Sequence, residues 1–445
     1  MGHIVGKSRG QIEMLCLDEM VDKGSPARQI DKFIDNANTS FFEKTRTKST
    51  GRSPFNPKDL LKLFVYGMDN GVTSSRKLER ECKCNIEVMW LLNGLAPDDR
   101  TICNFRRENA ENMVRFFNEF AVTLAKEGYI DGKILAVDGT KIRANNSRRK
   151  NYSAKKLDRH IEYINERIAK YLSDVDKNDK IEELEARKAR YELYKERIRS
   201  GEASEVSTTD PDSRLMKVAN NGMEICYNIQ TAVDGKNKLI AGALVTNEAN
   251  DQCQLYKVIG SVKKNLMLDS ATVLADKGYY NIEDFKNCNG DNILTIVAPQ
   301  SERKIEGIEF KKDDFTYDQE KDCYYCPVGK SLNFFREEDN GHRRYGGSKL
   351  ICRDCEHKKV CTKAVCKVVT RHKYASHAEQ NDKLFKENYK WYKLRQQLSE
   401  HPFGTIKRTM GIQQFLTRGL RAVTAEVALI FTVYNLKRLR TIGRS

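Results

Sequence analysis

Two short apolar runs constrain the fold of this chain more than any other feature of its sequence. Residues 133–139 read KILAVDG and residues 272–279 read TVLADKGY. Each run reaches an aspartate, Asp138 or Asp276, with a glycine one or two places further on. Runs this short are typical of strands that are covered on both faces. We therefore expect an α/β fold in which both strands lie in one sheet and end at their aspartates.

The two aspartates have two interpretations. Asp-Gly pairs commonly form turns, and either aspartate taken alone is explained that way. If the strands run the same way, however, their ends place the two carboxylates side by side, where they repel each other and need a cation. Mg²⁺ takes oxygen ligands, and two such ions about 3.5–4 Å apart activate a nucleophile in phosphodiester cleavage. A basic chain with a hairpin between the two aspartates favours this second interpretation.

The charge balance indicates a polyanionic partner. The chain has 78 lysines and arginines against 62 aspartates and glutamates, a formal net charge of +16. The basic residues cluster at 44–52, 141–156 and 436–444. Such clusters predict binding to nucleic acid, although a single charge run is often only a solvated face. The candidate phosphate contacts after the first strand are Lys141, Arg143, Arg148, Arg149 and Lys150.

The rest of the chain alternates between helical and strand patterns. Residues 11–125 have helical spacing with proline starts and glycine stops, which suits either a helix-turn-helix DNA reader or a structural bundle. Residues 151–213 are highly charged with sparse apolar positions, which predicts two antiparallel helices inserted into the body. The sequence DGKN at 234–237 between two β-rich runs is the strongest hairpin signal. From residue 381 onward the pattern is helical again.

Six of the thirteen cysteines lie between residues 303 and 380. Two Cys-x-x-Cys pairs separated by a loop are the spacing of a tetrahedral zinc site, whereas the alternative is an insertion with reduced, metal-free thiols. A tetrahedral zinc site needs only four ligands. The last two cysteines therefore either take no part or replace one of the other four, and His357 or His372 could also replace a cysteine ligand. The six candidate ligands are Cys323, Cys326, Cys352, Cys355, Cys361 and Cys366.

A third carboxylate is needed to complete a two-metal site, and Glu400 is the candidate. It precedes Lys407 by seven residues, about two helical turns, so the two side chains can share a face. Pro402 lacks a backbone N–H, so we expect the helix to begin near Ser399 or to bend there.

The order of these motifs resembles the DDE transposases of bacterial insertion sequences, and most closely the group named IS eleven-eighty-two. The matching segments are Asp138-Gly-Thr, Asp276-x-Gly-Tyr and Glu400-His-Pro-Phe-Gly-x-x-Lys407, followed by MGIQQFLTRGL and YNLKRL. Related transposases also carry Tyr-x-x-Arg before the glutamate. Here Tyr392 and Arg395 fit that pattern, but the step from arginine to glutamate is one residue longer.

The resemblance implies a function and a set of partners. An RNase H-like domain would hold two Mg²⁺ or Mn²⁺ ions through Asp138, Asp276 and Glu400. It would cut the terminal inverted repeats of double-stranded DNA and join the freed 3′-hydroxyl to target DNA. Lys407, Arg395 and Tyr392 would contact the DNA, and the enzyme would act as a homodimer. Two alternatives stay open: an inactive, zinc-containing DNA-binding protein derived from such an enzyme, and an RNase H-type nuclease acting on RNA–DNA hybrids.

These interpretations give a domain plan and a location. The α/β RNase H-like core has a mixed sheet with flanking helices. No run of roughly eighteen apolar residues and no signal peptide is present, so we expect a cytoplasmic protein without membrane contact, held at the nucleoid through DNA. The predicted domains are a helical DNA-binding domain at 1–125, a catalytic domain at 126–150, 214–302 and 381–445, a helical-hairpin insertion at 151–213 and a cysteine-rich insertion at 303–380.

Overall fold

The computed structural model describes residues 14, 16–45, 53–172, 178–201, 204–218, 222–300 and 306–443. Most of the basic cluster at 44–52 and the last residue of the cluster at 436–444 lie outside this described part. The chain divides into two compact units. The first consists of Met1–Asn250, Ser261–Met267 and Gln396–Ser445, and the second of Asp251–Gly260 and Leu268–Arg395.

The first unit begins with helices, as the sequence predicts. Asparagines interrupt the helical pattern twice where we expected continuous segments. Asn85 separates α4 from α5, because its side chain accepts hydrogen bonds from the N–H groups of Glu87 and Val88 and so starts a new helix. Asn109 separates α6 from α7 in the same region. The helices are α1 (Leu17–Met20), α2 (Pro26–Asn36), α3 (Pro57–Asp69), α4 (Ser75–Cys84), α5 (Ile86–Leu91), α6 (Asp99–Glu108) and α7 (Ala110–Lys126), with a 3₁₀ helix at Ser40–Thr45.

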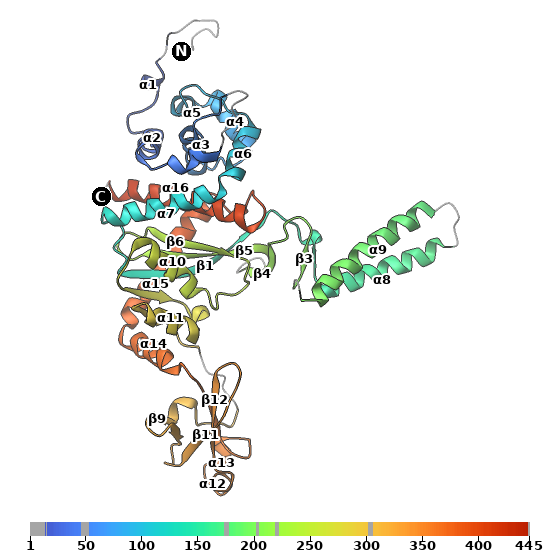
Figure 1. The fold of residues 1–445 in the computed structure, drawn as a ribbon, viewed down its shortest axis with the longest axis vertical. Coiled ribbons are helices and arrows are strands. Elements are labelled where there is room, and N and C mark those ends of the chain that lie inside the picture. The colour runs from blue at the N-terminus through green and yellow to red at the C-terminus, as the bar shows by residue number, and fades with distance from the viewer. Residues whose placement is uncertain are drawn as a thin grey trace, which may run out of the picture. The chain divides into compact units, whose positions relative to one another are not determined.

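The last helix, α16 (Leu420–Ile442), forms the centre of the first unit. Its residues from Val423 to Leu436 are almost all buried, and such all-round burial is expected of a helix that is apolar on every side. It packs against α3, α7 and strand β6 (Ile240–Thr246), and Figure 1 shows it lying beside α7 above the strands. None of the described helices is long and apolar enough to cross a membrane.

Three strands of the first unit pair antiparallel with β5 (Gly222–Asp234). Strand β1 (Ile134–Arg143) pairs with one edge of β5, and β6 and β4 (Arg214–Val218) follow each other along the other edge. The predicted hairpin at DGKN is confirmed as the connection between β5 and β6. Asn435 of α16 fastens the helix to this sheet, because its side-chain amide bonds both the N–H and the carbonyl of Ile240.

Strand β1 does not end at Asp138, so that part of the sequence prediction is wrong. Asp138 lies opposite Thr231 and Gly139 opposite Gln230, and the ladder continues to Arg143. The physical reason is that β5 presents an unbroken row of backbone partners, and pairing with them satisfies the N–H and carbonyl groups that a turn would leave exposed. The Asp-Gly pair is therefore a strand segment here.

Two helices are present, as predicted, in the described part of residues 151–213, and that this segment is an insertion stays a prediction. They are α8 (Ala154–Tyr171) and α9 (Asn178–Arg199), which pack against each other and stand out from the strands of the first unit (Figure 1). A small apolar cluster that includes Tyr152, Leu157, Ile164 and Tyr191 holds the pair together. A 3₁₀ turn at Arg148–Lys150 and a two-residue sheet of β2 (Asn151–Tyr152) and β3 (Val206–Ser207) lie at the base.

The second unit holds a parallel pair of strands, β7 (Ala271–Ala275) and β8 (Ile293–Val297), connected through helix α11 (Ile282–Gly290). Strand β7 was predicted from the run that reaches Asp276. Helix α10 (Leu255–Leu266) is divided between the two units. Together with the antiparallel ladders of the first unit, the parallel pair agrees with the expected α/β class with mixed pairing. Helix α14 (Ala375–Glu387) packs on β8 and α11.

The cysteine-rich segment forms a five-stranded antiparallel sheet that the sequence did not predict. Its strand order is β13-β12-β11-β10-β9, and its core is small: Phe315, Tyr324, Leu332, Tyr345 and Val369. Two short helices, α12 (Lys349–Arg353) and α13 (Lys358–Cys361), lie between the last two strands, and a 3₁₀ turn (Lys312–Asp314) precedes the first. The strands are β9 (Thr316–Asp318), β10 (Cys323–Tyr325), β11 (Ser331–Glu337), β12 (His342–Gly347) and β13 (Val368–His372).

Helix α15 (Tyr389–Gly404) differs from the prediction at Pro402. The helix does not begin near Ser399, because it runs from Tyr389 through the proline to Gly404 and continues as a π-helical turn at Thr405–Thr409. Pro402 removes one backbone donor, and the change of helix type follows within one turn. The Thr405 hydroxyl donates to the carbonyl of His401 at 3.0 Å within this irregular segment.

A buried ion cluster links the two ends of the first unit and provides a stability test. The Asp69 side chain is only 4% exposed and accepts from Lys437 and Arg440 of α16, each at 2.5 Å. We expect Asp69→Asn to lower the free energy of unfolding by about 3 kcal/mol, because it leaves two partly buried cations short of a partner. Urea denaturation of the full chain measures this change.

The matched control is Glu111→Gln, since Glu111 is 81% exposed and pairs with an exposed Arg421. This substitution should change the free energy of unfolding by less than about 0.5 kcal/mol. Equal effects of the two substitutions would contradict a stabilising role for the buried cluster.

Candidate active site

Strand β1 presents Asp138 and Thr140 on one face of the sheet. Residues two apart in a strand point to the same side, so these two side chains are neighbours. The half-buried Asp138 carboxylate accepts from the N–H of Gly139 at 2.9 Å, and its carbonyl accepts from the Thr231 hydroxyl at 3.3 Å. These contacts fix the strand and the carboxylate that it carries.

Lys407 reaches the same face of β1 from the π-helical turn. Its ammonium group donates to the Thr140 hydroxyl at 2.5 Å and to the carbonyl of Lys141 at 3.4 Å. Burial lowers the pKa of Lys407 below the ordinary lysine value of 10.5, because a charged group loses water there. Single π turns are frequent at functional sites, and this one places Lys407 on the Asp138 side of the sheet.

Glu400 lies exposed near the end of α15, two turns before Lys407. Its carboxylate accepts from the side-chain amide of Gln396 at 2.9 Å. The next residue, His401, anchors this turn of the helix to Tyr434 of α16 through a contact of 3.0 Å at Nδ1. The Tyr434 hydroxyl proton goes to the carbonyl of Lys238 at 2.8 Å, so Nδ1 of His401 must donate. Burial lowers the pKa of His401, which favours the neutral imidazole.

Asp276 belongs to the second unit and follows β7 directly, as predicted. Its carboxylate accepts from the N–H of Gly278 at 2.8 Å and so caps the 3₁₀ turn Lys277–Tyr279. A β-carbon at position 278 would lie 3.0 Å from Oδ1 of Asp276 and 3.7 Å from Oδ2 of Asp251. Glycine therefore keeps room for two carboxylates, and Asp251 is a neighbour that the sequence pattern did not reveal.

The structure brings the predicted site residues together in two groups. In the first unit, the bond between Lys407 and Thr140 connects the end of the Glu400 helix to the strand of Asp138. Asp276 lies in the second unit, so convergence of the three carboxylates stays a prediction. In the part of the chain that the structure describes, no group of three or more histidine, cysteine, aspartate and glutamate side chains is arranged to hold a metal ion.

The donor chemistry of these residues nevertheless suits a hard divalent cation. All three predicted ligands are carboxylates, and Mg²⁺ and Mn²⁺ prefer oxygen donors of this kind. Both aspartates are oriented by a backbone N–H on one carboxylate oxygen. The side chains therefore fit such an ion in type.

The five basic residues predicted to contact phosphate, at positions 141, 143 and 148–150, are exposed apart from the half-buried Lys141. Arg148 pairs with Glu224 of β5 at 2.8 Å, whereas Arg149 and Lys150 are exposed in the 3₁₀ turn that follows. Lys141 and Arg143 are the last residues of β1 on the side away from Asp138. Lys156 shapes the turn, because its ammonium group donates to the carbonyls of residues 148, 149 and 151.

Tyr392 and Arg395 lie one turn apart in the part of α15 that belongs to the second unit. The guanidinium of Arg395 lies over the ring of Tyr392, 5.7 Å from its centre, and that ring packs edge-on against Phe385 at 4.9 Å. The aromatic contacts position Tyr392 within its own unit. A role of either residue in DNA binding stays a prediction.

Four of the six predicted zinc ligands line one small cavity of the second unit: Cys326, Cys352, Cys355 and Cys361. The buried Cys323 and the half-buried Cys366 do not line it. Of the two candidate substitutes, His357 lines the same cavity, whereas His372 packs against His342.

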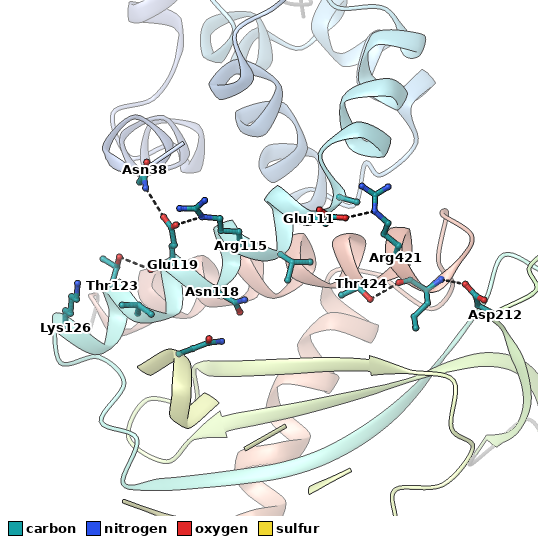
Figure 2. A pocket seen from close by; sticks show the side chains of 15 residues that line it. Asn38, Glu111, Arg115, Asn118, Glu119, Thr123, Lys126, Asp212, Arg421 and Thr424 are labelled. Carbon is teal, nitrogen blue, oxygen red and sulfur yellow. Dashed lines mark hydrogen bonds and ion pairs between the residues drawn. The ribbon is translucent and has the colours of Figure 1, made fainter. Parts of the chain in front are cut away.

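A large groove of the first unit contains none of the predicted site residues. It has a volume of about 1090 Å³ and lies along α7 and the start of α16. Figure 2 shows that its charged side chains already contact one another: Arg115 bonds Glu119 at 2.7 Å, and Arg421 bonds Glu111 at 3.1 Å. The groove is therefore a packing seam beside the core helices.

Two family models match this chain. Residues 15–108 match a model described as Transposase domain (DUF772), and residues 325–440 match one described as Transposase DDE domain. The two matches support a DDE-type insertion-sequence transposase. The second match contains Glu400 and Lys407, whereas Asp138 and Asp276 lie outside both matches. No curated protein and no solved structure gave a match.

A DDE transposase domain implies the RNase H-like fold, with which the mixed strand pairing and flanking helices agree. It also implies a DNA substrate and a divalent metal ion, without saying which ion. The assignment to the IS eleven-eighty-two group and the roles of individual residues stay predictions.

The environment of Lys407 gives a direct test of the geometry. We expect the Lys407 amine to titrate below 10.5, and Thr140→Val to lower its pKa further because the charged form loses a hydrogen-bond acceptor. NMR of ¹³C-dimethylated lysines measures both values, and the Lys407→Arg variant identifies the signal.

Thr123→Val on α7 is the matched control and should leave the Lys407 signal unchanged, because Thr123 bonds the carbonyl of Glu119 within its own helix. An identical Lys407 titration in the Thr140→Val protein would show that the bond to Lys407 does not form in solution.

Proposed function

We propose that this chain is a DNA transposase of the IS eleven-eighty-two group. It binds the terminal inverted repeats of its element, cleaves the element ends and joins the 3′-hydroxyls to target DNA. The observation that carries the proposal is the contact between Lys407 and Thr140, which holds a carboxylate helix against a carboxylate strand in a chain with two transposase matches.

Asp138, Asp276 and Glu400 would hold two Mg²⁺ or Mn²⁺ ions. Bound in this way, such ions would activate the attacking oxygen and stabilise the leaving oxygen of the phosphodiester. The N–H groups of Gly139 and Gly278 orient the two aspartates for this role, each through one carboxylate oxygen. Gln396 does the same for Glu400.

Lys407 would hold a DNA phosphate beside this site. A charge-assisted contact to a phosphate oxygen is strong and carries no sequence information. Thr140 and the carbonyl of Lys141 keep the ammonium group in place before DNA arrives. A bound phosphate would restore the preference for the charged lysine that burial weakens.

The N-terminal helices would read the inverted repeats. This region contains a compact group in which α4 packs against both α5 and α6. Several exposed basic side chains lie on α4 and α6, where they can reach DNA phosphates. They are Arg76, Lys77, Arg80, Lys83, Arg100 and Arg107. Joining two element ends requires two active sites, so we expect a homodimer on DNA, and the substrate places its action at the nucleoid.

The carboxylates provide the decisive test of this function. We expect Asp138→Asn, Asp276→Asn and Glu400→Gln each to lower DNA cleavage by at least about 1000-fold, since each removes a charged ligand, while DNA affinity stays within about two-fold. The assay uses the purified full chain, Mg²⁺ or Mn²⁺, and a duplex that carries the DNA flanking its coding region. Chelation by EDTA should abolish cleavage.

Asp269→Asn is the matched control, because Asp269 is exposed in the loop before β7. It should leave cleavage unchanged. Normal cleavage by the Asp276→Asn protein would overturn the assignment, and DNA binding without cleavage in either metal would favour an inactive DNA-binding protein. Preferential cleavage of an RNA–DNA hybrid would favour an RNase H-type nuclease.

Lys407 can be tested separately through the salt dependence of DNA binding. Removing one phosphate contact reduces the slope of log K against log salt by about one. We therefore expect Lys407→Ala to weaken binding to any duplex and to flatten this slope by about one, as measured by fluorescence anisotropy. Lys264→Ala, at an exposed lysine on α10, should not change it. Equal slopes for wild type and Lys407→Ala would exclude the phosphate contact.

A further inference from the structure

We propose that Cys326, Cys352, Cys355 and Cys361 form a structural zinc site in the second unit, and that Cys323 and Cys366 take no part in it. This site uses none of the residues of the proposed active site and goes beyond the proposed function. It would brace the five-stranded sheet on which the cysteines lie.

The four thiols come from three separate segments that meet at one cavity. Cys326 follows β10, Cys352 lies in α12 with Cys355 just beyond it, and Cys361 ends α13. All four line the same cavity of about 50 Å³, which has room for an ion and little else.

The chain after Cys326 turns back so that a backbone N–H points at the Cys326 sulfur. The N–H of Lys330 donates to the Cys326 sulfur at 3.3 Å, and the N–H of Gly329 donates to the Cys326 carbonyl at 2.8 Å. Gly329 has a φ of 76°, a conformation that favours glycine and lets the chain fold back onto the sulfur. A donor aimed at a sulfur stabilises the thiolate, which is the form that binds metal.

The sheet also makes room for Cys352. A β-carbon at Gly347 of β12 would lie 2.9 Å from the Cys352 sulfur, closer than such atoms approach. Glycine at this strand position therefore allows the thiol to reach the cavity. Together with the turn at Cys326, this gives two places where the backbone is shaped around a sulfur.

The other two cysteines are excluded by their positions. Cys323 is 5% exposed within β10, paired between Asp318 of β9 and Asn333 of β11, and Cys366 lies beyond the cavity lining. The proposal therefore differs from the simplest interpretation of the sequence, in which the first Cys-x-x-Cys pair supplies two ligands. His357 lines the cavity, but its ring packs against Phe310 at 5.8 Å.

In the part of the chain that the structure describes, no group of three or more potential ligands is already arranged to hold a metal ion, so the sulfurs would move closer together on binding. Zinc would bind them as thiolates, which would release the thiol protons and place each sulfur about 2.3 Å from the ion. The sheet has a reason to need a metal, because its buried core cluster consists of only five residues. Small domains with so little core are commonly stabilised by a bound metal ion.

Metal analysis of the intact chain tests this proposal. Purified protein, dialysed against metal-free buffer, should contain about one zinc per chain by mass spectrometry of its metals. Serine at any of positions 326, 352, 355 and 361 should lower the content to below about 0.2. Cys323→Ser, Cys366→Ser and His357→Ala should keep it near one. Asp276→Asn should also keep it, which separates this site from the active site.

Cobalt substitution tests for the metal site in the wild-type protein, so it remains informative even if a serine variant fails to fold. Wild-type protein reconstituted with Co²⁺ alone should show the intense thiolate charge-transfer band and visible bands of a tetrahedral site. A chain that binds neither Zn²⁺ nor Co²⁺ would overturn the proposal. Loss of metal in Cys366→Ser or Cys323→Ser, to the same extent as in Cys352→Ser, would overturn the ligand assignment.

Discussion

The burial of α16 is the constraint on which the first unit depends. A helix that is apolar around its whole circumference must be enclosed, and α3, α7 and β6 enclose it from different parts of the chain. The buried polar side chains Glu426, Thr432 and Asn435 of this helix all form hydrogen bonds. Glu426 accepts from the backbone at Leu416 and Thr417, and Asn435 bonds Ile240. These bonds fix the segment just before α16, and therefore the position at which Phe415 bonds Arg143 of β1.

The arrangement of the candidate active-site residues in this unit follows from that enclosure. Because the segment between α15 and α16 is tied to the end of β1, the π-helical turn lies beside the strand, and its lysine meets Thr140. Tyr434 of α16 holds His401, which is the neighbour of Glu400. A single buried helix thus positions the carboxylate, the lysine and the strand aspartate without contributing a reactive group itself.

Secondary structure was predicted correctly where neighbouring residues in the sequence determine it. It was predicted poorly where a distant segment of the chain determines it through pairing or contact. Proline starts, the DGKN hairpin and the strand-to-turn change at Asp276 are local and were found. Asp138 was misread as a strand end because its pairing with β5, about ninety residues away, is invisible in the run itself. Thr140 was not predicted as a site residue for the same reason. Only its hydrogen bond to Lys407 distinguishes it from the other threonines of the chain. The set of proposed zinc ligands could be reduced from six cysteines to four only because the structure shows Cys323 inside a strand and four other cysteines around one cavity.

The base of the α8–α9 pair has a structural consequence. Asn151 pairs with Ser207 and Tyr152 with Val206, so the chain leaves the first unit and returns to it at adjacent backbone positions. The helices carry their own apolar cluster, which includes Tyr191. The two helices therefore leave the unit at one pair of adjacent backbone positions. A joint of this kind can accommodate a change in the length of the appendage without altering the strands beside it.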